Sequence, residues 1–173
     1  MRVAILTVSD AGSRGEREDA SGDEIDRWVA ARNAIRAART IIPDDTLAII
    51  RALTGWCDGD AADLVLTTGG TGLSPRDITP EATRAVIERE APGIAERIRL
   101  VSLNSFPRAA LGRGIAGVRQ QTLIVNLPGS PSGVRDALAA LDSIIEHACD
   151  ILRGRISEHG GEHGALGSDA RPR

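Results

Sequence analysis

A loop rich in glycine and threonine, residues 67–80 with the sequence TTGGTGLSPRDITP, holds the residue types best suited to chemistry. It follows a short apolar run, residues 63–66, that has the pattern of a buried strand. Because its three glycines have no side chains, successive backbone N–H groups can approach a phosphate closely. Asp77 lies five residues beyond Gly72. A small-residue loop with a nearby carboxylate indicates a phosphate-bearing ligand and a divalent metal that bridges the two.

Further polar residues follow other predicted strands. Ser9 and Asp10 follow the first strand, Asp44 and Asp45 follow the second, and the sequence NLPGS, residues 126–130, ends the last. In an open parallel sheet, ligands bind beyond the carboxyl ends of the strands, so we expect these segments to share one cleft. Two anion-binding loops with several carboxylates suit a nucleotidyl transfer that needs phosphate pockets and Mg²⁺.

Each of these features also has a purely structural interpretation. A glycine-rich turn after a strand is often only a turn, and Asp44 or Asp77 could serve as helix caps. The segment LPGSP could be the turn and first proline of the last helix. Spacing alone therefore predicts an α/β protein with a phosphate-bearing ligand, and it is the joint occurrence of the motifs that favours a site.

Composition excludes several classes of function. The chain has 173 residues, with 21 basic against 24 acidic residues and a net charge of -3, and all its basic residues are arginine. Without a basic run or many aromatic residues, nucleic-acid binding is not expected. Without lysine, the loop cannot be a Walker A motif and no lysyl intermediate can form.

The N-terminus and the cysteines predict the compartment. The first apolar run has only six residues, which is too short for a signal peptide or a membrane span. Cys57 and Cys149 lie far apart without metal-ligand spacing and are expected to be reduced. We therefore expect a cytoplasmic protein that does not contact a membrane.

Alternating strand and helix patterns predict the elements that position the motifs. Strands are expected over residues 3–8, 37–42, 63–67, 114–118 and 122–126. Helices are expected from a capping box at Ser21 to about 33, from 44 to 56, from 79, over 92–103 and over 134–152. This order predicts a three-layer α/β fold with a mostly parallel sheet, helices on both faces and one antiparallel strand.

The chain is expected to form one domain over residues 1–153, followed by a flexible polar tail over 154–173. In the loop before the first helix, Asp19 is interpreted as a solvated residue. His159 and His163 lie four residues apart, but their glycine-rich surroundings argue against a metal site.

The motifs resemble a known family. The stretches TVSD, EDASG, IPDD, DLVLTTGGTGLSPRDITPEAT and LIVNLPGSPSGVRDAL occur in the order and spacing of the molybdopterin-binding domain of Mog/MoaB-type molybdopterin adenylyltransferases. This family includes the gephyrin G domain. The resemblance covers about residues 2–153 and implies the molybdopterin-binding domain fold.

The resemblance implies that the terminal phosphate of molybdopterin attacks the α-phosphate of Mg-ATP, which yields adenylyl-molybdopterin and pyrophosphate. Asp44 and Asp77 match the two functionally important carboxylates, which would hold Mg²⁺. The residues implied to bind the ligands are Ser9, Asp10, Thr68, Gly69, Gly70, Thr71, Gly72, Ser102, Asn126, Pro128, Gly129 and Ser130. A homotrimer, with hand-over of the product to a metal-insertion protein, is also implied.

The chain departs from the family pattern between residues 100 and 113. Phe106 stands where threonine is usual, and Gly112 stands where serine is usual. Because these changes concern pterin contacts, an alternative function is a molybdopterin-binding carrier without adenylyl transfer. A scaffold like that of gephyrin is disfavoured, because only the tail follows the domain.

Overall fold

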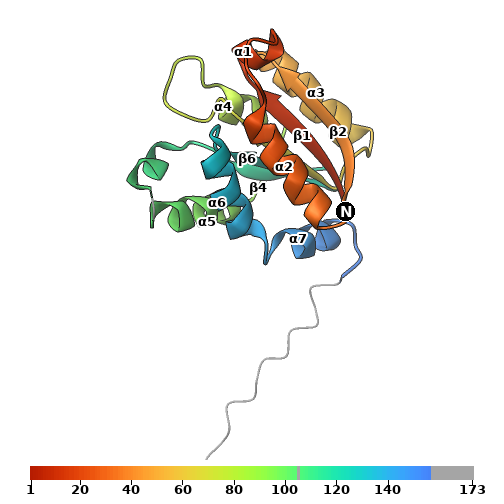
Figure 1. The fold of residues 1–173 in the computed structure, drawn as a ribbon. Helices are drawn as coiled ribbons and strands as arrows, with labels where there is room; N and C mark the ends of the chain where they lie inside the picture. Colours follow the sequence, from red (N-terminus) through yellow and green to blue (C-terminus); the bar gives the residue numbers. More distant parts are fainter. Residues whose placement is uncertain (105, 157–173) are drawn as a thin grey trace, which may run out of the picture.

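A mixed sheet runs through the part of the protein that the computed structural model describes, residues 1–104 and 106–156 (Figure 1). Its strands within these residues are β1 Arg2–Val8, β2 Ile35–Ile42, β3 Leu64–Thr68, β4 Arg89–Glu90, β5 Ala116–Arg119 and β6 Thr122–Leu127. They lie in the order β2-β1-β3-β6-β5-β4. The pairs β1–β2, β1–β3 and β3–β6 are parallel, whereas β5 is antiparallel to both β6 and β4. The predicted mostly parallel sheet with one antiparallel strand is confirmed.

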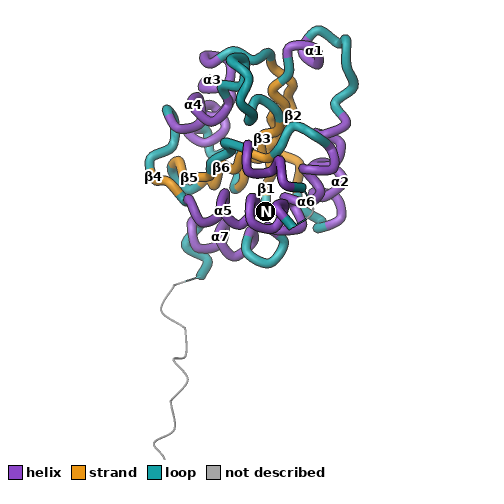
Figure 2. Tube along the Cα trace, turned by 90° about the vertical axis from the view of Figure 1, so that its left-hand side faces the viewer, coloured by secondary structure: helices purple, strands orange, loops and turns teal. Residues whose placement is uncertain are grey.

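Helices cover both faces of this sheet (Figures 1 and 2). One face packs against α2 Ala20–Ala31, α5 Pro92–Leu103, α6 Pro131–Leu141 and α7 Ile145–Leu152. The other face packs against α3 Thr46–Asp58 and α4 Thr79–Arg84. Two short helices, α1 Asp10–Ser13 and the 3₁₀ helix η1 Pro107–Leu111, lie in the connections. The three predicted layers are therefore present.

The apolar run in β1 follows from this double coverage. Val3 and Ile5 belong to the core that includes Ile25 of α2, whereas Ala4 and Leu6 belong to the core on the α3 side. Successive side chains of a strand point to opposite faces, so a strand covered on both faces is apolar at every position.

The connection between β1 and α2 differs from the prediction. The short helix α1 forms where a loop was expected, and α2 begins at Ala20 instead of at the Ser21 capping box. Asp19 is the N-cap of α2, and its carboxylate accepts a hydrogen bond from the Gly22 amide at 2.9 Å. Local capping by Asp19 thus sets the start of this helix.

The prediction that Asp19 is a solvated loop residue is wrong. Only 6% of its side chain is exposed, since the carboxylate pairs with Arg39 of β2 at 2.8 Å. It also accepts a hydrogen bond from Thr7 Oγ1 of β1 at 3.0 Å. Neutralisation by Arg39, which is 20 residues away in the sequence, is what allows this carboxylate to be buried.

The predicted helix over 134–152 is divided into α6 and α7. Trp28 Nε1 donates to the carboxylate of Asp142 at 2.8 Å, and Arg97 Nε donates to the Ala140 carbonyl at 2.6 Å. These bonds give partners to polar groups at the end of α6, so the chain can turn there. The turn places Ile145 in the core, where it is fully buried.

The strands also differ from the prediction. β2 begins at Ile35, two residues earlier than predicted, and the two-residue strand β4 was not predicted. Both residues of β4 are exposed, so it has no apolar pattern that would reveal it.

From residue 157 on, the predicted tail lies outside the described residues, as do His159 and His163. Across residues 1–104 and 106–156, no helix is long and apolar enough to cross a membrane.

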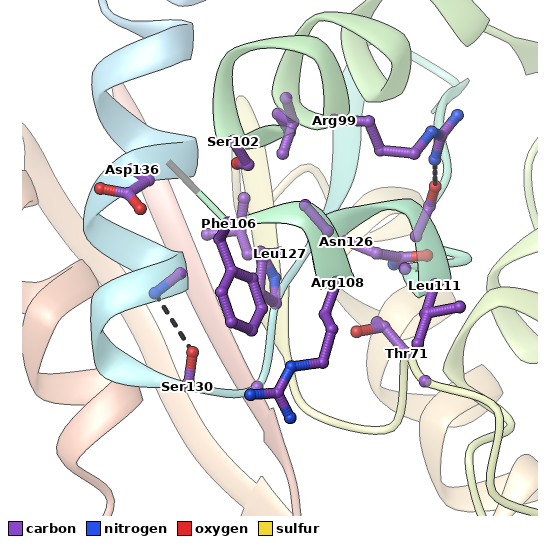
Figure 3. A pocket seen from close by; sticks show the side chains of 18 of the residues that line it. Thr71, Arg99, Ser102, Phe106, Arg108, Leu111, Asn126, Leu127, Ser130 and Asp136 are labelled. Carbon is purple, nitrogen blue, oxygen red and sulfur yellow. Dashed lines mark hydrogen bonds between the residues drawn. The ribbon is translucent and has the colours of Figure 1, made fainter. Parts of the chain in front are cut away.

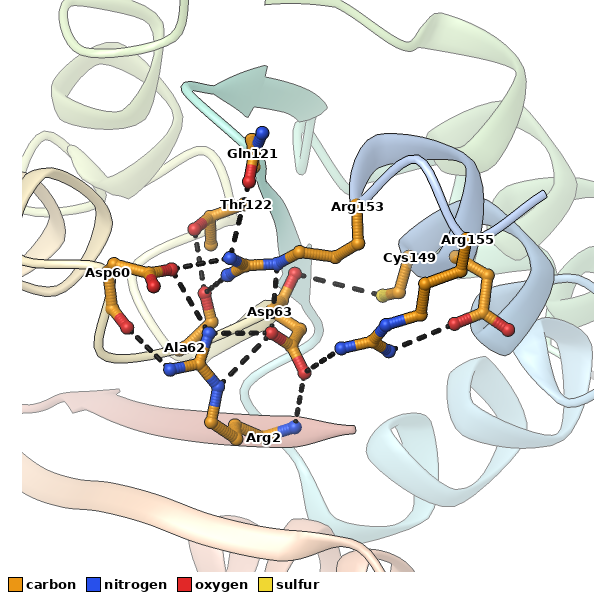
Figure 4. A network of polar contacts seen from close by, with 10 residues as sticks. Arg2, Asp60, Ala62, Asp63, Gln121, Thr122, Cys149, Arg153 and Arg155 are labelled. Atoms are coloured by element: carbon orange, nitrogen blue, oxygen red, sulfur yellow. Dashed lines mark hydrogen bonds and ion pairs between the residues drawn. The ribbon is translucent and has the colours of Figure 1, made fainter. Parts of the chain in front are cut away.

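A buried carboxylate, Asp63, ties the amino ends of the sheet to the end of α7 (Figure 4). Its side chain is 1% exposed and lies 2.8 Å from Arg2 Nη2 and 2.9 Å from Arg153 Nε. Burial of Asp63 opposes its ionisation and by itself would raise its pKa. Hydrogen bonds from the side chain and amide of Arg2, together with the charges of Arg153 and Arg2, have the larger effect and lower the pKa of Asp63. This network is at the edge of the sheet opposite the predicted cleft and is structural.

Asp63→Asn is expected to destabilise the protein by about 3 kcal/mol at neutral pH, because it removes the buried negative charge between Arg2 and Arg153 and leaves them only the exposed carboxylate of Asp60. A carboxylate whose pKa is lowered by folding stabilises fully above its unfolded pKa, and that stability is lost as the pH falls through the folded pKa. The difference in the free energy of unfolding between the variant and the wild type should therefore become smaller in acid. Urea unfolding between pH 7 and pH 3 measures it.

Asp150→Asn is the matched control, because Asp150 pairs with Arg155 at 3.0 Å but its side chain is 35% exposed. A partly exposed pair of this kind contributes at most about 1 kcal/mol. Equal losses of unfolding free energy in Asp63→Asn and Asp150→Asn would contradict the structural role of Asp63.

Candidate functional site

The carboxyl ends of the four parallel strands meet at one edge of the sheet, as predicted. Beyond them lie Ser9 after β1, Asp44 after β2, the loop 69–72 after β3 and the loop 128–130 after β6. Thr68 Oγ1 donates to the Pro128 carbonyl at 2.7 Å and so joins the last two loops. This edge is where a doubly covered parallel sheet binds its ligands.

The glycine loop has a backbone that only glycine adopts readily. Gly69 has a φ of 91° and Gly70 a φ of 63°. A Cβ on Gly69 would lie 2.2 Å from the Val8 carbonyl oxygen of β1. Thr79 holds the loop in this shape, since its Oγ1 donates to the Gly69 carbonyl at 2.9 Å and its amide donates to the Gly70 carbonyl at 3.1 Å. Positive φ and close packing together require glycine at position 69.

A polar cavity of about 280 Å³ lies between this loop, β1 and the start of α2. We call it the smaller compartment. It is lined by five of the predicted site residues before position 80, which are Ser9, Asp44, Gly69, Gly70 and Asp77. Asp19, which was not predicted to belong to the site, also lines it. The signal for Asp19 was the helix-capping pattern of aspartate three residues before Gly22.

Asp44 is held in place by its neighbour Asp10. The Asp10 amide donates to Asp44 Oδ2 at 2.9 Å, and the Asp44 amide donates to Asp10 Oδ1 at 3.0 Å. Burial raises the pKa of Asp44, and the negative charges of Asp10 and Asp77 raise it further. Asp10 itself pairs with Arg76 at 2.6 Å, which lowers its pKa. Asp10 does not line the smaller compartment, and its contacts are those of a residue that positions Asp44.

Asp77 is held by its own turn and by Arg113. Its Oδ2 accepts a hydrogen bond from the Ser74 amide at 2.9 Å. Arg113 donates through Nε to the Gly72 carbonyl at 2.6 Å and also donates to the Asp77 carbonyl. Arg113 thus joins both ends of the segment 72–77. No local pattern marks this role, because Arg113 is 36 residues from Asp77 in the sequence.

A larger cavity of about 480 Å³ lies beside the first, between α5, η1 and α6 (Figure 3). We call it the larger compartment. Among the predicted site residues, it is lined by Thr71, Gly72, Ser102, Asn126, Pro128, Gly129 and Ser130. Leu127 of the predicted segment 126–130 also lines it, as do Arg99, Arg108 and Asp136, which no sequence motif assigned to the site.

Phe106 covers part of the larger compartment, and the Arg108 guanidinium lies 5.2 Å from the centroid of its ring (Figure 3). The ring is 48% exposed. An aromatic face beside a cation is suited to a flat heteroaromatic ligand.

Three predicted ligand-binding residues have structural contacts. Asn126 Nδ2 donates to Thr67 Oγ1 and Thr83 Oγ1, both at 2.9 Å, so its amide joins β6 to β3 and α4. Ser130 is the N-cap of α6 and accepts a hydrogen bond from the Gly133 amide. Thr68, like Asp10, lines neither compartment. These side chains fix the walls of the site.

Gly129 lines both compartments and marks where they meet. A Cβ at this position would lie 3.3 Å from Gly69 Cα in the opposite loop. The two loops therefore approach closely at the boundary, and a group bound in one compartment adjoins a group bound in the other.

The donor set of Asp44 and Asp77 fits Mg²⁺. Both carboxylates line the smaller compartment, and the charge of Asp77 contributes to the raised pKa of Asp44, so a cation between them would relieve their repulsion. Within residues 1–104 and 106–156, no group of three or more metal-ligating side chains occurs. Mg²⁺ is commonly held by one or two carboxylates together with substrate phosphates and water, whereas zinc requires more protein ligands.

Comparisons with known proteins point the same way. A family model described as a probable molybdopterin binding domain matches residues 4–147. A protein of Helicobacter pylori strain J99 named molybdopterin adenylyltransferase is 39% identical over 160 residues, which is 91% of each chain.

Solved structures agree with this. The molybdopterin biosynthesis enzyme MoaB of Thermus thermophilus has a TM-score of 0.84 and 51% identity, over 88% of this chain and 96% of its own. The molybdopterin biosynthesis Mog protein of Mycobacterium ulcerans has a TM-score of 0.82 and 39% identity, over 87% of this chain and 97% of its own.

Proposed function

The chain belongs to the family of molybdopterin-binding domains, and from this premise we infer that it is a molybdopterin adenylyltransferase of molybdenum cofactor biosynthesis. The family resemblance predicted from the motifs is confirmed. Relatives with this enzyme's name match most of the chain and favour the transferase over a carrier. The observation that carries the proposal is the pair of adjoining compartments, a polar one lined by Asp44 and Asp77 among other carboxylates and a larger one with an aromatic wall.

We assign the two substrates to the two compartments. The pterin enters the larger one, and the phosphates of ATP enter the smaller one between the glycine loop and the two carboxylates. The terminal phosphate of molybdopterin then attacks the α-phosphorus of ATP at the boundary near Gly129. A bond forms from that phosphate oxygen to the α-phosphorus, the bond from the α-phosphorus to the bridging oxygen breaks, and pyrophosphate leaves.

The residues of the chain act by position and charge. Asp44 and Asp77 would hold Mg²⁺, which when bound neutralises phosphate charge. Asp10 and Arg113 keep these carboxylates in place, and the backbone of the glycine loop follows the phosphates closely. Since the attacking group belongs to the substrate, no protein nucleophile is required, and catalysis depends on proximity and electrostatic stabilisation.

Release of pyrophosphate tests the proposal directly. The purified protein is incubated with molybdopterin and Mg-ATP, pyrophosphate is measured, and adenylyl-molybdopterin is identified by mass. We expect both products in equal amounts, and neither when molybdopterin or Mg²⁺ is left out. Tight molybdopterin binding by calorimetry with no pyrophosphate would instead establish the carrier.

Phe106→Ala tests the assignment of the larger compartment. Loss of an aromatic wall costs about 1 kcal/mol of stacking, so the dissociation constant for molybdopterin should rise about fivefold to tenfold. The KM for ATP should stay within about twofold, since Phe106 does not line the smaller compartment. Isothermal calorimetry and steady-state kinetics measure the two quantities.

The control for Phe106 is Leu100→Ala, since Leu100 is 66% exposed on α5 and lines neither compartment. It should change neither constant. An equal effect of Phe106→Ala on both substrates would contradict the division of the site.

Two further features of the proposal follow the family resemblance. We propose a homotrimer, which light scattering tests, and hand-over of the product to a metal-insertion protein, which a pull-down with that protein tests.

We also propose a cytoplasmic location, which is supported by Cys57 and Cys149, since both are free thiols. Burial raises their pKa values to about 11 and about 12, so both stay protonated at neutral pH. Cell fractionation checks the location.

A further inference from the structure

Negative charge predominates around the smaller compartment. Its lining carboxylates are those of Glu18, Asp19, Asp44 and Asp77. The charge of Asp19 is balanced by Arg39, and a divalent cation would balance Asp44 and Asp77. A triphosphate adds several more negative charges, so its outer phosphates need a further cation. Arg17 is the cationic side chain among the described residues that line this compartment.

Neighbouring arginines already have carboxylate partners. Arg14 pairs with Glu16 at 2.8 Å, and Arg76 pairs with Asp10 at 2.6 Å. Arg17, by contrast, makes no hydrogen bond or ion pair with any other described residue of the chain. It can therefore bind an anion without first losing a partner inside the protein.

The loop that bears Arg17 is fixed at both ends. On one side, the Gly15 amide donates to the Gly12 carbonyl at 3.0 Å, and the Glu16 amide donates to the Ala11 carbonyl at 2.9 Å. On the other side, the buried carboxylate of Asp19 accepts from Thr7 of β1 at 3.0 Å. The backbone next to Arg17 is thus held against the sheet, which keeps residue 17 at the wall of the compartment.

We propose that Arg17 binds the β- and γ-phosphates of ATP and the pyrophosphate that leaves, an inference that rests on the proposed function. When the bond to the α-phosphorus breaks, negative charge accumulates on the leaving pyrophosphate. A guanidinium can donate two parallel hydrogen bonds to such a group and stabilise that charge. Arg17 thereby adds its positive charge to that of the divalent cation that Asp44 and Asp77 would hold.

Binding of pyrophosphate tests this role without turnover. Mg-pyrophosphate is titrated by calorimetry into the wild type, Arg17→Ala, Arg17→Lys and the control Arg14→Ala, at one ionic strength. Because Arg17→Ala loses a charge-assisted pair, its dissociation constant for Mg-pyrophosphate should be about tenfold higher than that of the wild type. Arg17→Lys should restore part of the affinity, and Arg14→Ala should stay within about twofold of the wild type.

Kinetics supply a second readout. In Arg17→Ala, the inhibition constant for added pyrophosphate and the KM for ATP should rise together, while the dissociation constant for molybdopterin stays unchanged. The role of Arg17 would be overturned if the wild type bound no detectable pyrophosphate or if Arg17→Ala bound it as tightly as the wild type. It would also be overturned if Arg14→Ala weakened binding as much as Arg17→Ala does. If the wild type releases pyrophosphate in turnover but Arg17→Ala binds it normally, only this inference fails. If the wild type shows no turnover, the proposed function fails instead.

Discussion

Asp77→Asn is expected to lower the rate of adenylyl transfer by about 10²–10³-fold while molybdopterin binding changes little. Asparagine keeps an oxygen that can accept the hydrogen bond from the Ser74 amide, so the turn at 74–77 should be retained. What is lost is the negative charge beside Asp44. Because Mg²⁺ would bind between these two side chains, the Mg²⁺ concentration for half-maximal rate should also rise.

The measurements for Asp77 are kcat and its Mg²⁺ dependence, with calorimetry for molybdopterin. Asp45→Asn is the matched control, since Asp45 is an exposed carboxylate next to Asp44 that caps α3 through the Ala48 amide at 2.8 Å. Asparagine is an equally good N-cap, so stability and rate should stay near those of the wild type. Proportional losses of rate and molybdopterin affinity in Asp77→Asn would contradict its assignment to the metal.

Gly69→Ala should abolish turnover, with a loss of at least about 10³-fold, and should also lower stability. The φ of 91° alone costs a residue with a side chain roughly 1–3 kcal/mol. The added Cβ would also lie 2.2 Å from the Val8 carbonyl oxygen, so the loop must move away from β1. Such a movement displaces both the phosphate-binding backbone and the boundary at Gly129, and a shift of about 1 Å is enough to reduce catalysis strongly.

Thermal unfolding and the pyrophosphate assay measure the two effects of Gly69→Ala. Gly55→Ala is the control, because a Cβ on this exposed glycine of α3 would meet nothing within 4 Å. It should raise stability by about 0.5–1 kcal/mol through helix propensity and leave the rate unchanged. Retained activity in Gly69→Ala would show that the loop geometry is not required.

Much of the fold was predictable because its signals are local. The apolar run before Ser9, the capping aspartates and the glycines after β3 each act on residues within a few positions of themselves. The division of 134–152 into α6 and α7 was not predictable in this way, because Asp142 accepts its hydrogen bond from Trp28, 114 residues away. The burial of Asp19 likewise depends on Arg39.

The order of the motifs along the chain was sufficient to predict the α/β fold, the shared sheet edge, the family and the pair Asp44 and Asp77. The fold and the shared edge follow from strand and loop spacing, because parallel strands must bring their carboxyl ends together. The family and the roles of Asp44 and Asp77 came instead from the resemblance of the motifs. Folding alone determined how the predicted residues divide between two compartments that meet at Gly129. It also distinguished residues that line a cavity from Asp10 and Thr68, which hold others in place. The physical reason is that the contacts of Asp10 and Thr68 join residues 34 and 60 positions apart, and a local sequence pattern does not indicate partners at such distances.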